Sequence, residues 1–196
     1  MKVDIFNTDN KYKVIYADPA WSYRDKALAG KRGAGCHYTV MGIDDIKALP
    51  VKNISDDDCT LFMWVTMPFL REAFEVMDAW GFKYKTCAFT WIKKNKKADT
   101  LFWGMGNWTR ANAELCLLGV KGKPKRVDAG VHSVIMSHIE EHSKKPDEAR
   151  NRIVKLLGGG AIYDRVICKA ECNWLGLLGK RSVKTIIYNL NKILFL

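Results

Sequence analysis

Four apolar segments of the chain have the length and composition of β-strands. The segment from 59 to 66 is a continuous apolar run, which is typical of a strand whose sheet is covered on both faces. The segment from 12 to 17 is shorter and leads directly into an acid. We predict strands over residues 12–17, 59–66, 82–95 and 114–122.

Helical spacing of apolar residues indicates three helices. The stretch 41–50 carries acids near its start and a proline at its end, as a short helix does. A second helix is expected over 68–80 and a third from about residue 146. Their predicted buried stripes are Leu70, Phe74, Met77 and Trp80 in the second helix, and Ile153, Leu156 and Leu157 in the third.

Strands that alternate with helices predict an α/β fold, with a sheet flanked by crossover helices. A chain of 196 residues has room for one domain with a sizeable core. Trp64, Trp80 and Trp91 lie in strands or helical stripes, so we predict them to be core residues. Residues 22–38 form a Gly-rich basic loop and 101–113 an aromatic one, and loops this long are usually functional or mobile.

The chain is strongly basic, with 32 lysines and arginines against 21 acids and a net charge of +11. Such an excess favours a polyanion such as nucleic acid as partner. Three basic groups could rim one groove, although a merely solvated basic surface explains the charge equally well. The groups are Arg24, Lys26, Lys31 and Arg32; Lys93, Lys94, Lys96 and Lys97; and Lys121, Lys123, Lys125 and Arg126.

The cellular compartment is suggested by what the chain lacks. No apolar run has the length of a transmembrane helix, and residues 1–13 lack the apolar core of a secretory signal. We therefore expect a cytoplasmic protein, with no membrane association and with its six cysteines reduced. Cys168 and Cys172 are spaced like half of a zinc site, but no second pair or nearby histidine completes it, so no metal is predicted.

The first strand ends on Asp18, followed at once by Pro19, Ala20 and Trp21. In open α/β sheets, ligands bind outside the carboxyl ends of the strands, so an acid at this position is a candidate functional carboxylate. An aspartate that only caps the turn before a proline is the equal alternative on the tetrapeptide alone.

Six motifs in order give the sequence a resemblance to a known family. Asp-Pro-Ala-Trp is followed by "HYTVM", "LFMWVT", "WGFKYKTCAFTWIKKN", "GNWTRANAELCLLGVKGKP" and "HSKKPDEARNRI". In order and spacing these resemble the adenine N(6)-methyltransferases related to the 70-kDa subunit of the mRNA adenosine methyltransferase. The resemblance covers residues 11–157. It implies a Rossmann-like methyltransferase fold with a mixed, mostly parallel sheet, and S-adenosylmethionine as cofactor.

The resemblance also implies roles for particular residues. Asp18 and a backbone carbonyl of Pro19 or Ala20 would accept hydrogen bonds from the adenine amine, so that the nitrogen lone pair faces the methyl donor. Trp21 and Tyr38 would stack against a flipped base, with core packing as the alternative for both. Lys145 would lie in the cleft of cofactor and substrate together with Asp18, unless it is a solvated lysine at a helix start.

The chain departs from the family pattern at two places. Ala20 stands where the family usually has a second proline, which predicts a less rigid loop and a lower turnover. After Leu157 the family continues with a strand and a loop that contact the ribose and adenine of the cofactor, and this chain does not. We therefore expect residues 1–157 to form the methyltransferase domain and 158–196 a divergent tail, with a strand missing, sheet edges uncovered and cofactor binding weak or absent.

Codon degeneracy suggests a cause for the divergent tail. Codons for Val166 to Gly179 can be chosen so that the next reading frame encodes Leu-Phe-Ala-Arg-Gln-Asn-Ala-Ile-Gly-Trp-Asp-Cys-Trp, which resembles the missing family segment. We hypothesise a frameshift near the codons of Gly158 to Gly160. A divergent but genuine tail is the alternative, and the nucleotide sequence of the gene decides between them.

The function expected from these patterns is methylation of the exocyclic amino group of adenine in nucleic acid. DNA is favoured over RNA, because the short length resembles the bacterial and phage members of the family that act on DNA. The alternative is a catalytically inactive homologue or partner subunit that binds nucleic acid. The sequence leaves open whether the chain forms a homodimer or a heterodimer.

Overall fold

A mixed β-sheet forms the centre of the molecule over the ranges that the structure describes. The computed structural model describes residues 5–21, 41–106, 108–141, 143–158 and 165–169. Within them, six strands follow the order β5-β3-β4-β2-β1-β6. Their bounds are β1 Tyr12–Asp18, β2 Ser55–Val65, β3 Lys83–Lys94, β4 Glu114–Lys121, β5 Val134–His138 and β6 Arg165–Lys169.

Most strand pairings are parallel. β1 runs parallel to β2 and to β6, and β5 runs parallel to β3, whereas β4 is antiparallel to both β2 and β3. The predicted α/β class with a mixed sheet is therefore confirmed. Because β4 alone among these strands is reversed, its first residue lies at the edge of the sheet where β1, β2 and β3 have their carboxyl ends.

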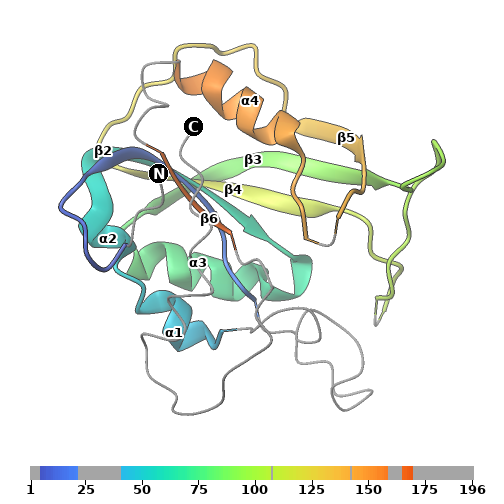
Figure 1. Ribbon diagram of the computed structural model, residues 1–196, viewed down its shortest axis with the longest axis horizontal. Coiled ribbons are helices and arrows are strands. Elements are labelled where there is room, and N and C mark those ends of the chain that lie inside the picture. Colours follow the sequence, from blue (N-terminus) through green and yellow to red (C-terminus); the bar gives the residue numbers. More distant parts are fainter. Residues whose placement is uncertain (1–4, 22–40, 107, 142, 159–164, 170–196) are drawn as a thin grey trace.

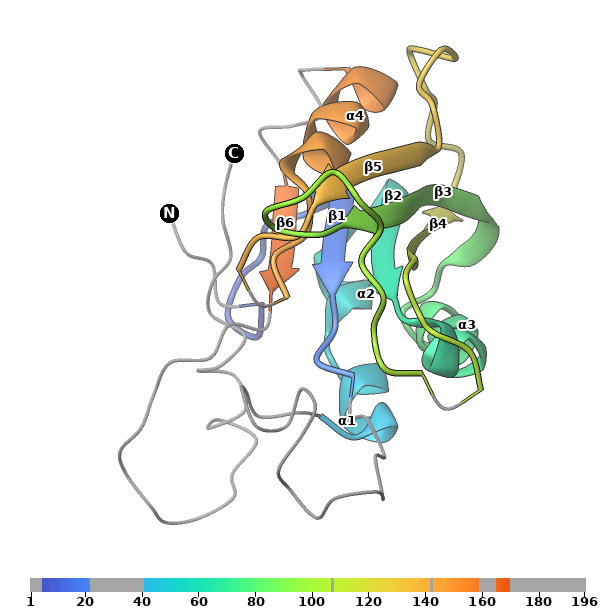
Figure 2. The ribbon, with the colours of Figure 1, turned by 90° about the vertical axis from the view of Figure 1, so that its right-hand side faces the viewer.

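Helices cover both faces of the sheet, as Figures 1 and 2 show from two directions. One face carries α4, and the other carries α1 and α3, with α2 leading into β2. The helices are α1 Ile43–Lys47, α2 Val51–Ile54, α3 Leu70–Ala79, which follows the 3-10 turn η3 Met67–Phe69, and α4 Asp147–Leu157.

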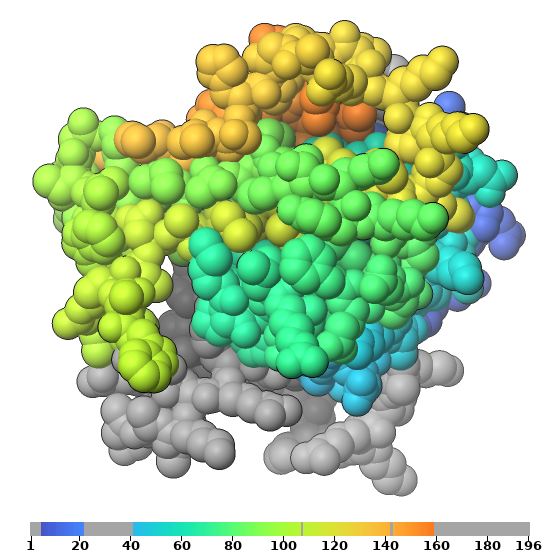
Figure 3. All heavy atoms as spheres, turned by 180° about the vertical axis from the view of Figure 1, so that it is seen from behind, coloured from blue at the N-terminus to red at the C-terminus, as the bar shows by residue number. Residues whose placement is uncertain are grey.

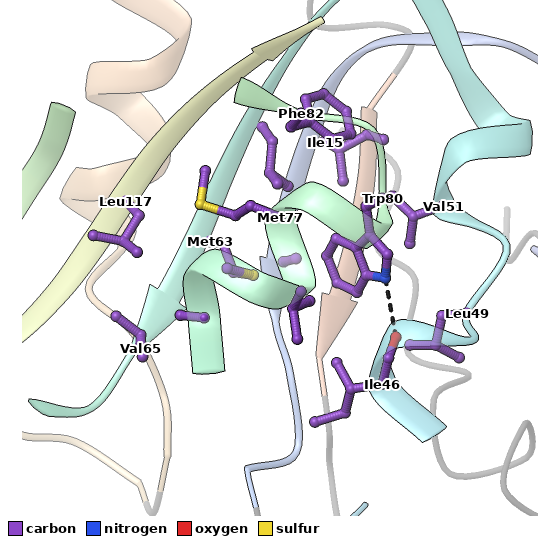
Figure 4. Close-up of a cluster of buried hydrophobic side chains, with 14 of the residues drawn as sticks. Ile15, Ile46, Leu49, Val51, Met63, Val65, Met77, Trp80, Phe82 and Leu117 are labelled. Atoms are coloured by element: carbon purple, nitrogen blue, oxygen red, sulfur yellow. Dashed lines mark hydrogen bonds between the residues drawn. The ribbon is translucent and has the colours of Figure 1, made fainter. Parts of the chain in front are cut away.

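Each face of the sheet has its own hydrophobic core, because side chains alternate along the strands. Ile15, Leu61 and Met63 pack towards α1 and α3, where the indole nitrogen of Trp80 donates a hydrogen bond to the carbonyl of Ile46 at 3.0 Å (Figure 4). The residues that alternate with these along β1 and β2 pack towards α4; they are Val14, Tyr16, Phe62 and Trp64. Trp64, Trp80 and Trp91 are at most 4% exposed, so their prediction as core residues is confirmed.

The predicted elements largely agree with the observed ones. The four predicted strands correspond to β1 to β4. The helix predicted over 68–80 begins as a 3-10 turn and ends at Ala79, with Trp80 as its cap and Gly81 next, whose φ of 81° suits glycine. In that helix Met77 is fully buried, whereas Leu70 and Phe74 are only partly buried. β5 and α2 were not predicted. None of the described helices is long and apolar enough to cross a membrane.

The structure corrects one expectation about the tail. A strand was expected to be missing after residue 157, but β6 pairs in parallel with β1 over Val14 to Asp18. The side of β1 away from β2 is therefore covered, and the prediction of an uncovered edge there is wrong. The domain division at 157/158 and the frameshift stay predictions.

Candidate active site

A cavity of about 480 Å³ opens at the edge of the sheet where β1, β2 and β3 end. Its walls come from the end of β1, the end of β2, β3, the first residue of β4, and the segment between β5 and α4. The lining residues are Asp18, Pro19, Trp21, Val65, Thr66, Trp91, Lys93, Phe102, Glu114, Ile139, Glu140, Glu141, Ser143, Lys144 and Lys145. The strand-end position expected for a site that includes Asp18 is the one observed.

Strand register explains why these residues meet. Val65 at the end of β2 pairs with Leu115, and Trp91 near the end of β3 pairs with Glu114. The reversed direction of β4 thus places an acid beside the carboxyl ends of its neighbours.

Four charged side chains form a connected network in this cavity. The Lys145 ammonium nitrogen lies 3.0 Å from Asp18 Oδ2 and 3.2 Å from Glu114 Oε2. The other Glu114 oxygen lies 2.5 Å from the ammonium nitrogen of Lys93. All four side chains are 13–17% exposed. Two carboxylates and two ammonium groups balance, so the network tolerates burial that an unpaired charge would not.

The network shifts the pKa values of Lys145 and Glu114. Burial by itself lowers the pKa of Lys145, but the carboxylates of Asp18 and Glu114 outweigh it and raise that pKa well above its usual range. Burial raises the pKa of Glu114, but Lys145 and Lys93 outweigh it, so the net pKa of Glu114 lies below its ordinary value. Lys145 also lies 5.8 Å from the centre of the Trp64 ring, where a cation is attracted. Lys145 is therefore a fixed cation rather than a proton acceptor.

The two backbone carbonyls predicted to bind an amine are placed differently. The Pro19 carbonyl accepts a hydrogen bond from the Trp21 amide at 2.9 Å, and the Ala20 carbonyl accepts one from Met41 at 2.9 Å. A carbonyl oxygen can accept a second hydrogen bond. Pro19 lines the cavity, whereas Ala20 is 3% exposed and does not. Of these two residues, Pro19 is the one that borders the cavity, and the role of its carbonyl stays a prediction.

Trp21 lies in the core rather than on an open loop. Its indole nitrogen donates to the Trp64 carbonyl at 3.0 Å, and its ring stacks on Phe69 with centroids 5.8 Å apart. The ring is 4% exposed although it lines the cavity. The core packing given as the alternative for Trp21 is therefore observed, with Phe69 covering one face of the ring. Stacking of a base on Trp21 stays a prediction, and Tyr38 lies outside the described residues.

Lys145 is the sequence-predicted residue that the structure clarifies most. One residue, the N-cap Pro146, separates it from the start of α4 at Asp147. A solvated lysine at a helix start was the alternative, and the 13% exposure of this side chain contradicts it. The structure brings Asp18 and Lys145 into direct contact, and their roles toward a cofactor or a substrate stay predictions. The capping alternative for Asp18 does not account for this ion pair.

Sequence reasoning missed two members of the network. Glu114 opens an apolar run and has the pattern of a polar residue that merely precedes a strand, and Lys93 was counted only as part of a basic group. The signal that could have identified Glu114 is the antiparallel direction of β4, which apolar pattern does not encode.

A single groove rimmed by all three basic groups, one of the two alternatives left open by the charge, does not fit the two groups that the structure describes. Lys93 and its neighbours lie where β3 ends, beside the cavity. Lys121 lies at the far end of β4, opposite Cys59, and Lys123 to Arg126 follow it there. The third group falls within residues 22–40, outside the described part.

A charged cavity at the carboxyl ends of strands in a mixed α/β sheet defines a ligand-binding enzyme site of the open-sheet type. The chain belongs to the MT-A70 family, because the model of that family matches residues 12–162. This membership confirms the resemblance found from the motifs and makes the chain a member of a family of methyltransferases.

Similar proteins include short and long relatives. The chain is 30% identical over 184 residues to the Type II methyltransferase M.MunI of a Mycoplasma species, with 85% of this chain and 75% of that protein covered. It is 29% identical over 151 residues to the N(6)-adenosine-methyltransferase catalytic subunit METTL3 of Homo sapiens and to an N(6)-adenosine-methyltransferase MT-A70-like protein of Drosophila melanogaster. Those alignments cover 76% of this chain but only 24% and 23% of the two longer proteins.

Proposed function

We propose that this chain transfers a methyl group to the exocyclic amino group of adenine in DNA, on a Rossmann-like methyltransferase fold. The observation that carries the proposal is the contact of Lys145 with the Asp18 carboxylate, 3.0 Å, inside a cavity at the strand ends. The adenine amine is a weak nucleophile, because its lone pair is delocalised into the ring. A site for this reaction needs a fixed acceptor for the amine hydrogens and negative charge beside the nitrogen.

Asp18 and Pro19 supply both requirements. The carboxylate of Asp18 and the carbonyl of Pro19 accept the two amine hydrogens, which draws the nitrogen towards tetrahedral geometry and orients its lone pair. As the nitrogen becomes positive, the Asp18 carboxylate stabilises the charge, and the methylated nitrogen then releases one of its two protons to water. Lys145, held as a cation, holds that carboxylate in place through the ion pair. Glu114 and Lys93 in turn hold Lys145.

The lining of the cavity fits S-adenosylmethionine, the cofactor proposed here. A volume of about 480 Å³ lies in the range of small-molecule sites, and carboxylates and lysines together suit a ligand with both cationic and anionic groups. The buried Thr66 hydroxyl lines the cavity and has no hydrogen-bond partner among the described residues, so a ligand can satisfy it. S-adenosylmethionine, when bound, supplies the electrophilic methyl group.

DNA is proposed as the substrate on two grounds. A net charge of +11 favours a nucleic acid. The chain also covers three quarters of the Type II methyltransferase to which it is similar, but about a quarter of the adenosine methyltransferases from animals.

Transfer of a tritiated methyl group to unmethylated plasmid DNA tests the proposal, with an RNA of the same sequence run in parallel. Asp18→Ala and the isosteric Asp18→Asn are expected to abolish incorporation into DNA. Asp78→Asn is the matched control, because Asp78 lies exposed on α3, away from the cavity, and should leave the rate unchanged. Incorporation that survives in Asp18→Asn contradicts the proposed role of the carboxylate.

A non-catalytic subunit that binds nucleic acid is the second candidate, favoured by Ala20 in the motif and by the divergent tail. The same experiment separates the two. Binding of DNA without methyl incorporation above the Asp18→Ala background supports the second candidate and contradicts the first.

A further inference from the structure

Between β3 and β4 the chain forms a loop that carries large apolar side chains into solvent. Trp103 is 59% exposed, Met105 79% and Trp108 100%. In the space-filling view the yellow-green atoms of this loop project from the edge of the molecule (Figure 3). A cluster of exposed apolar side chains usually marks a surface that binds another molecule. We call residues 101–106 and 108–111 the projecting loop.

Hydrogen bonds hold the base of the projecting loop in one shape. The side chain of Asn112 accepts a hydrogen bond from the Lys93 amide and donates to the Lys93 carbonyl, both at 2.9 Å. The Gly104 amide donates to the Ala111 carbonyl at 2.7 Å. A Cβ atom at Gly106 would lie 1.8 Å from the Thr109 carbonyl oxygen, so the turn requires glycine. The loop is therefore an ordered projection from the sheet.

The projecting loop starts at the wall of the cavity. Phe102 lines the cavity, and its amide donates to the carbonyl of Lys93, which also lines it. The side chain of Asn112 also donates to the Phe102 carbonyl. Trp103 follows Phe102 directly, so the exposed aromatic surface begins one residue from the site proposed for the target base.

We propose that the projecting loop enters the base stack of duplex DNA and holds it open while an adenine occupies the cavity. This inference rests on the proposed function. An adenine in a duplex must leave the stack before an enzyme can reach its amine, and the vacancy costs stacking energy. Apolar side chains inserted between base steps offset that cost in proteins that deform DNA. Trp103, Met105 and Trp108 are the inserting side chains.

Charge favours nucleic acid over a protein as the occupant of this surface. The projecting loop carries no acid, and Arg110 lies beside its tip with its guanidinium 3.0 Å from the Met105 sulfur. Lys96 and Lys97 are exposed in the turn that precedes the loop. In nucleic-acid complexes, cationic side chains contact the phosphates while neighbouring aromatic rings stack on the bases.

The test compares the binding of two fluorescein-labelled duplexes of one sequence, measured by anisotropy. One duplex is intact, and the other has an adenine opposite an abasic position, where the base is already unpaired. Trp108→Ala and Trp103→Ala are expected to weaken binding to the intact duplex about tenfold and binding to the opened duplex by less than about twofold. Met136→Ala, which truncates an apolar side chain that is 53% exposed on β5, should change neither.

The outcomes separate this inference from the proposed function. Equal losses on both duplexes, or no loss on either, overturn the insertion of the loop into DNA. A change of oligomeric state in sedimentation, without the selective loss, assigns the surface to a protein partner and also overturns it. Methyl transfer is measured on the same duplexes: selective binding without methylation refutes the proposed function alone, and methylation without selectivity refutes the loop's role alone.

Discussion

Lys145 forms an ion pair with Asp18 at 3.0 Å, although Lys145 lies just before α4 and Asp18 is the last residue of β1. The two meet because both the end of β1 and the segment between β5 and α4 lie at one edge of the sheet. Glu114 reaches the same lysine from β4 at 3.2 Å. Lys145 is therefore the cation that joins the two carboxylates, and we predict that its replacement affects both folding and methyl transfer.

Lys145→Met keeps the length of the side chain and removes its charge. Two carboxylates are then left buried with less compensation, and breaking such a pair costs about 3–5 kcal/mol. Methyl transfer should fall at least about a hundredfold, because Asp18 loses the contact that orients it. Lys155→Met is the matched control, since Lys155 is 63% exposed and pairs with Asp128 at the surface. Urea denaturation and incorporation of tritiated methyl measure the two effects, and a stable, active Lys145→Met would contradict both.

Acid should destabilise the protein through Glu114. Its pKa in the folded state lies below the ordinary value of 4.5, so its ionisation adds stability above pH 4.5, and this contribution is lost as the pH falls through the folded pKa. Lys145 has a raised pKa, so its contribution is present below pH 10.5 and is lost only in strong alkali. Between those limits neither group makes stability depend on pH.

Glu114→Gln tests the predicted loss of stability at acid pH. The free energy of unfolding of this variant should fall less steeply below pH 4.5 than that of the natural chain. Glu75→Gln serves as the control, because Glu75 pairs with Lys47 on the surface, where solvent screens the pair. Identical slopes for Glu114→Gln and the natural chain would show that the carboxylate is not linked to folding.

The elements predicted from the sequence are those whose burial leaves a periodic pattern. β2 is buried on both faces, and its continuous apolar run was sufficient to identify it. β5 was missed because Ile135 is buried but Val134 and Met136 are about half exposed, so the short strand has no polar face. The pattern that identifies a strand is thus lost where an edge strand exposes apolar residues.

Site residues that belong to a motif could be predicted from the sequence. A site residue that reaches the cavity only because of the direction of its strand could not. Asp18 and Lys145 were found through motifs, and the structure places them in contact. Glu114 joins them only because β4 is antiparallel to its neighbours. Trp21 shows another limit: base stacking and core packing were both open for its ring, and the packing of Phe69, which the motif does not encode, decides its burial.

Replacement of Ala20 by proline should raise the rate of methyl transfer a few-fold, because proline fixes φ in the turn that presents the Pro19 carbonyl. Ala20→Gly loosens the same turn and should lower the rate, which makes it the opposing control. Both are measured at saturating DNA, with thermal unfolding to exclude a folding defect at this buried position. An Ala20→Pro enzyme with an unchanged rate would refute the role of the loop's rigidity.

Binding of S-adenosylmethionine should be weak in this chain, because residues 158–196 replace the family segment that the resemblance assigns to the ribose and adenine of the cofactor. β6 supplies a strand beside β1, so a loss of affinity would arise from the side chains of the tail rather than from a gap in the sheet. Isothermal calorimetry measures the affinity, and a micromolar dissociation constant would contradict the expectation.

The matched comparison is a chain in which the gene's next reading frame is restored after Gly158. If the frameshift hypothesis holds, the codons of residues 166–179 encode the family segment in that frame, and the restored chain binds the cofactor at least about tenfold more tightly. Sequencing these codons is the decisive first step. Codons that do not yield the family segment refute the frameshift, and the tail is then a genuine part of the protein whose own side chains must be tested at the cofactor site.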